Sequence, residues 1–224
     1  MNKKAVIILS GGVDSTTLLY DSLRKGYEAE CLTFIYGQKH GREVDSARRV
    51  AGGVNAPHKV IDLSPLGEIL SGSALTDANI DIPDVPETAE HYDTLKTTIV
   101  PNRNAIFLSI AVGRAVSMGS DYVFFGAHNS DRGVYPDCRE EFVESFQTSE
   151  RLATANPDLN ILAPFVFMDK ADIVMLGARL GVPFGETWSC YKGGVAHCGV
   201  CSSCRERKRA FIDAGVPDPT GYER

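Results

Sequence analysis

Residues 4–15 read KAVIILSGGVDS, in which five apolar residues lead into a turn with two glycines. The apolar run at 5–9 predicts a buried parallel strand, and the residues after Asp14 are typical of a helix with an apolar face. A strand that turns into a helix directs backbone N–H groups and the positive end of the helix dipole at one point. Gly11 and Gly12 allow an anion to approach that backbone closely. The stretch therefore predicts a phosphate-binding turn, with an ordinary β–α turn as the alternative.

The order of residues in this turn distinguishes between phosphate-binding motifs. A Walker A loop requires G-x-x-x-x-G-K-[ST] and a dinucleotide fingerprint requires G-x-G-x-x-G, and the sequence has neither. Residues 10–15, SGGVDS, instead resemble the SGGxDS signature of the ATP pyrophosphatases, whose loop cradles pyrophosphate while a nucleophile attacks the α-phosphate. The resemblance implies nucleotide contacts at Leu9, Ser10, Gly11, Gly12, Val13, Asp14, Ser15, Thr16, Thr17, Leu18 and Leu19.

The composition is that of a soluble globular protein. With 224 residues, 43% hydrophobic and 23% charged, the chain is long enough for one sizeable α/β domain and a small appendage. A net charge of −6 argues against a protein that binds nucleic acid directly. The basic run at 205–209, RERKR, is interpreted as a solvated helix face, with a local anion contact as the alternative.

The termini and apolar runs carry no sign of export or membrane insertion. No apolar stretch approaches the ~20 residues that span a bilayer. The chain begins MNKK, but the apolar run behind it is short and has no cleavage site. We therefore expect a cytoplasmic protein without a membrane partner.

Strand and helix patterns alternate along the chain. Apolar runs predict strands at 4–9, 30–36, 58–63 and 122–127. Helical spacing predicts helices at 15–25, 42–51, 104–117, 140–154 and 170–180. Repeated β–α units predict an α/β fold with a doubly wound parallel sheet. Ligands of such sheets bind beyond the carboxyl ends of the strands, where SGGVDS falls.

The pattern breaks at residues 71–98. This stretch contains Pro83 and Pro86, and loops of this length in compact domains are usually functional or disordered. We expect a lid over the site. Its acidic residues are Asp77, Asp81, Asp84, Glu87, Glu90 and Asp93.

Four of the six cysteines have metal-ligand spacing. Cys190, Cys198, Cys201 and Cys204 form C-x7-C-x2-C-x2-C, which suits a closed tetrahedral Zn²⁺ site of the structural kind. An iron–sulfur cluster is the alternative, and zinc is favoured because nothing else indicates redox chemistry. His197 could replace a cysteine but is expected to be exposed or to lie behind the ligands. The prediction is one zinc ion in a C-terminal segment, 186–224, packed on a nucleotide-binding domain, 1–185.

Further motifs narrow the family. Residues 135–139, YPDCR, follow a predicted strand, and together with PNRN at 101–104 they resemble the 7-cyano-7-deazaguanine synthases of queuosine biosynthesis. The resemblance extends over essentially the whole chain and includes YGQKH at 36–40 and DKADI at 169–173. It implies an adenine nucleotide alpha hydrolase-like, Rossmann-like fold, a C-terminal zinc site of four cysteines and a homodimer.

The same resemblance implies a ligase reaction on small molecules. The family converts 7-carboxy-7-deazaguanine and ammonia into the nitrile through adenylated acid and amide intermediates, releasing AMP and pyrophosphate. ATP would enter with Mg²⁺, because a substrate carboxylate and a polyanionic nucleotide repel each other. Since 224 residues leave no room for a glutaminase domain, ammonia is expected from solution or from a separate protein.

Matching motifs place the candidate catalytic residues. Arg103, Arg139 and Lys170 would supply positive charge, with Lys39 and Arg42 as outer possibilities. Lys170 opens a predicted helix, where a cation is unfavourable, and this is consistent with a phosphate contact, with a solvated lysine as an equal alternative. Asp131 and Asp137 could accept hydrogen bonds from the deazaguanine, with turn capping as the alternative. The predicted catalytic set is Asp14, Arg103, Asp131, Asp137, Arg139 and Lys170.

Three other cysteine and histidine positions carry weaker expectations. Cys138 is interpreted as pocket lining, because the implied mechanism needs no covalent step, and Cys31 as core. His40 is a candidate site residue, with an exposed loop histidine as the commoner alternative. Alternative functions are another ATP pyrophosphatase, amide-forming or tRNA-thiolating, and a non-catalytic zinc-containing nucleotide sensor.

Overall fold

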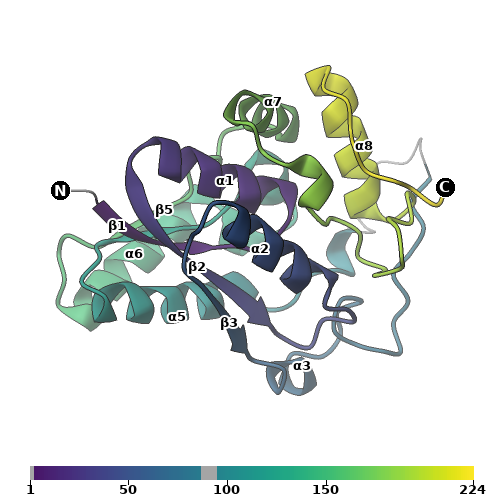
Figure 1. Ribbon diagram of the computed structural model, residues 1–224. Helices are drawn as coiled ribbons and strands as arrows, with labels where there is room; N and C mark the ends of the chain where they lie inside the picture. Colours follow the sequence, from purple (N-terminus) through teal and green to yellow (C-terminus); the bar gives the residue numbers. More distant parts are fainter. Residues whose placement is uncertain (1–2, 87–94) are drawn as a thin grey trace.

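The computed structural model describes residues 3–86 and 95–224, which contain one parallel five-stranded sheet (Figure 1). The strand order is β3-β2-β1-β4-β5. On the central strand, Val6 pairs with Glu30 on one side and with Val123 on the other. The strands are β1 (Lys3–Ile8), β2 (Tyr27–Ile35), β3 (His58–Asp62), β4 (Tyr122–Phe124) and β5 (Asn160–Leu162).

Helices cover both faces of the sheet. Figure 1 shows α1 and α2 over one face and α5 and α6 over the other, with α7 beside α1 and α8 beside α7. No helix within residues 3–86 and 95–224 is long and apolar enough to cross a membrane. The α-helices are α1 (Val13–Arg24), α2 (Arg42–Gly53), α3 (Leu66–Ile69), α5 (Arg103–Ser117), α6 (Glu140–Thr154), α7 (Lys170–Leu180) and α8 (Ser202–Ala214). Short 3-10 helices span Asn129–Gly133, Pro136–Cys138 and Phe184–Glu186.

The apolar run of β1 contributes to the hydrophobic core on each face of the sheet, because successive side chains of a strand point to opposite faces. Ala5 and Ile7 pack with Leu18 and other residues of α1 and α2. Val6 packs on the opposite face against the helix α5. All three β1 side chains are fully buried, which confirms the predicted parallel strand and the doubly wound α/β architecture.

The strand order reverses between β1 and β4, which places the site. The loops that follow these two strands diverge to opposite faces, and such a switch point leaves a crevice at the carboxyl edge of the sheet. Residues 10–15 follow β1 and residues 125–128 follow β4, so both segments border this crevice.

Two details of the predicted elements were wrong. The strand β5 (Asn160–Leu162) was not predicted, because three residues are too few to show a periodic pattern. The strand predicted at 122–127 ends at Phe124, and residues 125–128 instead form the loop that borders the crevice.

The segment predicted as a lid is described only at 71–86 and 95–98. Glu87, Glu90 and Asp93 of its acidic set lie outside the described residues. Ala74 is buried, and the N–H of Val85 donates a 2.8 Å hydrogen bond to the carbonyl oxygen of Val200. The chain at Val85 is therefore held against the C-terminal region, while a lid movement stays a prediction.

Candidate functional site

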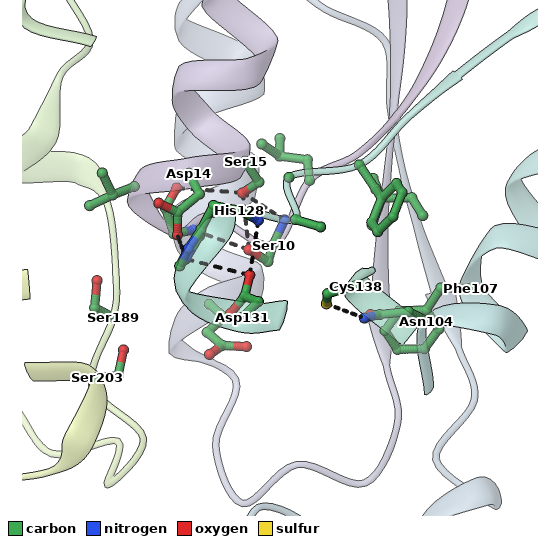
Figure 2. Close-up of a pocket in the computed structure, with 18 of the residues that line it drawn as sticks. Ser10, Asp14, Ser15, Asn104, Phe107, His128, Asp131, Cys138, Ser189 and Ser203 are labelled. Atoms are coloured by element: carbon green, nitrogen blue, oxygen red, sulfur yellow. Dashed lines mark hydrogen bonds and ion pairs between the residues drawn. The ribbon is translucent and has the colours of Figure 1, made fainter. Parts of the chain in front are cut away.

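A cavity of about 240 Å³ opens at the carboxyl ends of β1, β2 and β4 (Figure 2). Residues from five motifs that are far apart in the sequence line it. They are Ser10, Gly12, Val13, Asp14 and Ser15 of SGGVDS, Tyr36 of YGQKH, Arg103 and Asn104 of PNRN, Tyr135 and Cys138 of YPDCR, and Lys170 of DKADI. One cavity thus collects most of the side chains that sequence reasoning assigned to chemistry.

The SGGVDS turn is held in shape by its own serines and by close packing of α2. Ser10 N–H donates to Ser15 Oγ at 3.1 Å, and the two hydroxyl oxygens lie 3.0 Å apart. Gly11 has a φ of +81°, and a Cβ at this position would lie 2.5 Å from the carbonyl oxygen of Glu43. A glycine is therefore required at position 11 both by conformation and by space.

Asp14 and Lys170 form the ionic centre of the cavity. Lys170 Nζ lies 3.2 Å from Asp14 Oδ2 and 2.7 Å from Glu206 Oε2, and its side chain is only 12% exposed. Burial by itself lowers the pKa of Lys170, but the two carboxylates raise it well above its ordinary value. Burial raises the pKa of Asp14, and Lys170 brings it below its ordinary value. Lys170 is thus a buried, paired cation and not a solvated lysine.

His128 is a site residue that the sequence analysis missed. Its buried ring lies between two carboxylates, with Nε2 3.5 Å from Asp131 Oδ2 and 3.9 Å from Asp14 Oδ2. Figure 2 shows the three side chains together beside the SGGVDS turn. Asp131 also accepts the backbone N–H of His128 at 3.1 Å, and burial raises the pKa of Asp131. The position of His128 in the loop that follows β4, at the switch point, was the available signal.

The other half of the cavity is aromatic. Phe34 and Phe107 stack with ring centroids 4.2 Å apart, and the Arg103 guanidinium lies 5.8 Å from the Tyr36 ring centroid. Trp188 and Tyr191 also line the cavity. Burial raises the pKa of Tyr36 to about 12, so the phenol stays neutral near pH 7. This half offers flat apolar faces and a cation to a planar ligand.

Glu43 joins this aromatic half, and sequence reasoning also missed it. It stands in the first turn of α2 and lines the cavity. Burial raises its pKa to about 7, while the Arg103 guanidinium acts in the opposite direction.

Several predicted residues lie away from the cavity lining. Asp137 Oδ2 accepts the backbone N–H of Asn104 at 3.0 Å, which is the capping role given as its alternative. Arg139 Nε donates to the carbonyl oxygen of Arg132 at 2.9 Å. The outer candidate Lys39 bonds the carbonyl oxygen of Ile80, and Arg42 stacks on Trp188 at 5.6 Å. Thr16, Thr17, Leu18 and Leu19 are fully buried inside α1.

The four predicted cysteines form a buried cluster that could hold a metal ion. The Sγ atoms of Cys190, Cys198, Cys201 and Cys204 all lie within 4.8 Å of one another. Backbone N–H groups point at the sulfurs, as in the bond from Cys201 N to Cys198 Sγ at 3.3 Å. His197 stays outside the cluster, because its Nε2 accepts the backbone N–H of Ser189 at 3.0 Å. Cys31 is buried in the core, as predicted.

The cysteine cluster and the cavity share a wall. Trp188, Ser189 and Tyr191 flank the first cysteine, and Ser203 and Glu206 flank the last one, and all five line the cavity. The C-terminal segment therefore completes the cavity around the SGGVDS turn.

The interpretation of residues 205–209 as a solvated helix face was wrong for its central arginine. Arg207 is fully buried in α8 and is paired with Asp218 at 3.0 Å. Its guanidinium also donates to Thr187 Oγ1 at 2.7 Å and to the carbonyl oxygen of Phe184 at 3.0 Å. The C-terminal residues that fold back over α8 supply the carboxylate, and no local sequence pattern revealed that pairing.

Comparison with known sequences gives one consistent family. The family model described as "Queuosine biosynthesis protein QueC" matches residues 4–215. A relative from Archaeoglobus fulgidus is 49% identical over 216 residues, which cover 96% of this chain and 89% of the relative. A relative from Marinobacter nauticus is 47% identical over 224 residues, which cover 100% of this chain and 99% of the relative. Both relatives are named 7-cyano-7-deazaguanine synthase.

Comparison with solved structures shows the same fold at low identity. NMN synthetase from Francisella tularensis superposes with a TM-score of 0.55 at 15% identity, covering 96% of this chain and 79% of that chain. A 4-thiouridine synthetase, solved as an RNA complex with bound ATP, superposes with a TM-score of 0.53 at 17% identity. The match covers 95% of this chain and 50% of that chain. These likenesses agree with the predicted ATP pyrophosphatase-type fold.

Proposed function

The chain belongs to the QueC family of queuosine biosynthesis proteins, and from this premise we propose that it makes 7-cyano-7-deazaguanine from 7-carboxy-7-deazaguanine and ammonia, using ATP. The observation that carries the proposal is the convergence of five sequence motifs on one cavity beside the SGGVDS turn. An ATP-dependent carbon–nitrogen ligase of this kind needs a pyrophosphate site, cations and a flat compartment together, and the cavity offers all three.

The chemistry requires two activations of the same carbon. A carboxylate is a poor electrophile, so its oxygen first attacks the α-phosphate of ATP, which forms an acyl adenylate and releases pyrophosphate. Ammonia displaces AMP and gives the amide. The amide oxygen is adenylated by a second ATP, and loss of AMP with the remaining N–H protons leaves the nitrile. A turn that stabilises the pyrophosphate leaving group therefore serves twice.

The residues of the cavity that carry or attract charge have separate proposed roles in this reaction. We propose that the SGGVDS turn binds pyrophosphate and that Lys170 neutralises charge on the phosphates. Arg103, in the aromatic half, would balance the substrate carboxylate. Burial has already removed water from Lys170, so its attraction to a phosphate is stronger than that of a surface lysine.

Mg²⁺ would accompany ATP, and the carboxylate of Asp14 is suited to bind this ion. The Oδ1 atom of Asp14 is buried and has no hydrogen-bond partner among the described residues, while Oδ2 faces Lys170. Carboxylate oxygen is the ligand that Mg²⁺ prefers. Bound there, the ion would polarise the phosphate oxygens.

Zinc is the metal we propose for the four cysteines. With Zn–S bonds of about 2.3 Å, a tetrahedral site has sulfurs about 3.8 Å apart. The Sγ atoms of Cys198 and Cys204 are 3.9 Å apart, and the whole set falls within 4.8 Å. Four thiolates leave no open position, so the ion would fasten residues 186–224 onto the domain at 1–185 and take no part in the reaction.

The family resemblance also leads us to propose a cytoplasmic homodimer that acts on small molecules and contacts neither nucleic acid nor membrane. Size-exclusion chromatography with light scattering tests the dimer, and a monomer at micromolar concentration would contradict it.

Mass spectrometry tests the activity. Purified, metal-loaded protein is incubated with 7-carboxy-7-deazaguanine, MgATP and ammonium chloride, without glutamine. We expect a product of nitrile mass and two AMP for each nitrile. Amide as the final product would indicate an enzyme that stops after one adenylation. Intact ATP after prolonged incubation would favour a nucleotide sensor.

A further inference from the structure

The cavity contains more negative charge than a site for ATP should tolerate. Among the described residues four carboxylates line it, namely those of Asp14, Glu43, Asp131 and Glu206. Each one repels the phosphates and the substrate carboxylate in a partly desolvated site. A carboxylate retained there is expected to have a partner, either in the protein or in a ligand.

Three of these carboxylates have a partner in the protein. Asp14 and Glu206 share Lys170, at 3.2 and 2.7 Å. Asp131 accepts the backbone N–H of His128 at 3.1 Å. Each of these three carboxylates therefore has at least one polar contact within the protein, while Asp14 Oδ1 has no hydrogen-bond partner among the described residues.

Glu43 is different. Within residues 3–86 and 95–224 its carboxyl group makes no hydrogen bond and no ion pair within 4 Å, although it is half-buried and lines the cavity. Its backbone is fixed, because its carbonyl oxygen packs directly against Gly11. The Arg103 guanidinium is close enough to lower the pKa of Glu43 but forms no ion pair with it among the described residues, so both carboxylate oxygens are left to accept hydrogen bonds from a ligand.

The surroundings of Glu43 indicate a planar ligand. The cavity wall near it consists of Tyr36, Trp188 and Tyr191, and its charge acts on both tyrosines. Trp188 and Tyr191 lie in the segment that carries the first cysteine of the metal cluster. Such aromatic walls hold a flat ring between their faces and leave its edge to the polar group.

Two oxygens of one carboxylate match two neighbouring N–H donors. The pyrimidinone edge of 7-carboxy-7-deazaguanine carries such a pair, the ring N1–H and the 2-amino group. The adenine of ATP has a single amino group flanked by acceptors, and the ribose of ATP carries two hydroxyl groups. Carboxylates read base edges in this way elsewhere.

We propose that Glu43 accepts hydrogen bonds from the N1–H and 2-amino groups of the deazaguanine and thereby selects this ring. The assignment rests on the proposed function of the cavity. It gives the base-recognition role to Glu43, in place of Asp131 and Asp137, whose oxygens the backbone of His128 and Asn104 already occupies.

The substitution Glu43→Gln tests the assignment, because it keeps the shape and replaces one acceptor with a donor. We expect the KM for 7-carboxy-7-deazaguanine to rise about 10- to 100-fold, with the KM for ATP unchanged. Asp45→Asn is the matched control on the same helix, since Asp45 is 57% exposed and its one ion pair within the described part of the chain is with Arg48 at the surface. An unchanged KM for the deazaguanine would overturn the proposal, and so would a rise in the KM for ATP alone, which would assign Glu43 to the ribose.

A substrate analogue without the 2-amino group provides a second test that does not depend on the folding of a variant. The wild-type protein should bind this analogue more weakly than the normal substrate. The Glu43→Gln variant should bind the analogue about as weakly as the wild type does, because removing the 2-amino group and replacing Glu43 both remove the same contact. Equal use of both compounds by the wild type would overturn the assignment. If the wild type forms nitrile from neither compound, the proposed function itself has failed.

Discussion

The backbone N–H of Trp188 donates a 2.9 Å hydrogen bond to the carbonyl oxygen of Gly11. The indole Nε1 of the same tryptophan donates to the carbonyl oxygen of Cys190 at 2.7 Å. One residue thus connects the SGGVDS turn to the first cysteine of the four-cysteine cluster. We therefore expect a loss of structure in the cysteine cluster to disturb the SGGVDS turn as well, because these two hydrogen bonds of Trp188 join them.

We expect Cys201→Ser to lose metal, stability and ATP affinity together. A closed four-thiolate site can contribute on the order of 10 kcal/mol to folding, and a hydroxyl is a poor replacement for a thiolate. Metal analysis and thermal unfolding measure the first two effects, and ATP titration of the remaining soluble protein measures the third. Cys31→Ser is the control, because Cys31 is equally buried but lies in the core. Full metal content in Cys201→Ser would contradict the cluster.

We expect Gly11→Ala to abolish activity and to destabilise the fold. The left-handed conformation alone costs a Cβ-bearing residue about 1–2 kcal/mol, and the added Cβ would also meet the Glu43 carbonyl oxygen at 2.5 Å. Gly26→Ala is a matched control, because Gly26 has a φ of +84° but an added Cβ there would meet no atom of the described residues within 4 Å. Denaturant unfolding should show a clearly larger loss for Gly11→Ala. An equal loss of unfolding free energy in the two variants would mean that α2 shifts to make room for the added Cβ at position 11.

Local sequence predicted those parts of the site that a continuous stretch of chain builds. Residues 5–15 needed only an apolar run and a glycine turn, and the four cysteines needed only their spacing. Arg103 and Lys170 were found because each belongs to a motif that resembles a known family, whereas Tyr36 was only part of a quoted motif and was not singled out. The parallel sheet followed from the alternation of apolar runs with helical patterns.

The remaining features depend on tertiary packing. Glu43 and His128 are single polar residues in ordinary patterns, and only the fold brings them to the cavity. Arg207 stands in a run of charged residues that resembles a solvent face, and its partner Asp218 lies on a different segment of the chain. Thr16 and Thr17 follow the motif directly, but the turn of α1 directs them into the interior.

We expect Asp14→Ala to abolish AMP formation and to leave the fold intact. The substitution removes the carboxylate that we propose as a Mg²⁺ ligand beside ATP, and losing several kcal/mol of metal-ion stabilisation corresponds to a reaction slower by about 100- to 1000-fold. Lys170 keeps Glu206 at 2.7 Å, so no buried cation is left without a partner. Circular dichroism checks the fold, and an AMP assay measures the effect. Asp21→Ala is the control on the same helix, because Lys25 is its one ion-pair partner among the residues that the structure describes. Unchanged AMP release in Asp14→Ala would remove Asp14 from the site.

The pair of Arg207 and Asp218 should dominate the stability of the C-terminal region. The arginine side chain is 0% exposed and the aspartate 13%. Burial alone raises the pKa of Asp218, but hydrogen bonds from Arg207 and Tyr222 bring it below its ordinary value. A carboxyl group whose pKa is lowered by folding stabilises the protein above its unfolded pKa of about 3.9, and that contribution is lost as the pH falls through the folded value.

We expect Arg207→Met to lower the free energy of unfolding at pH 7 by about 3–5 kcal/mol, because it leaves a buried carboxylate without its cation. Arg209→Met is the control and should cost less than about 1 kcal/mol, since Arg209 is 77% exposed and its pair with Asp213 is at the surface. Without the cation, burial favours the protonated form of Asp218, so the gap between wild type and Arg207→Met should narrow as the pH falls from 7 to 4. Urea unfolding at several pH values measures this gap. A gap that stays constant with pH would show that the loss comes from packing of the arginine and not from its charge.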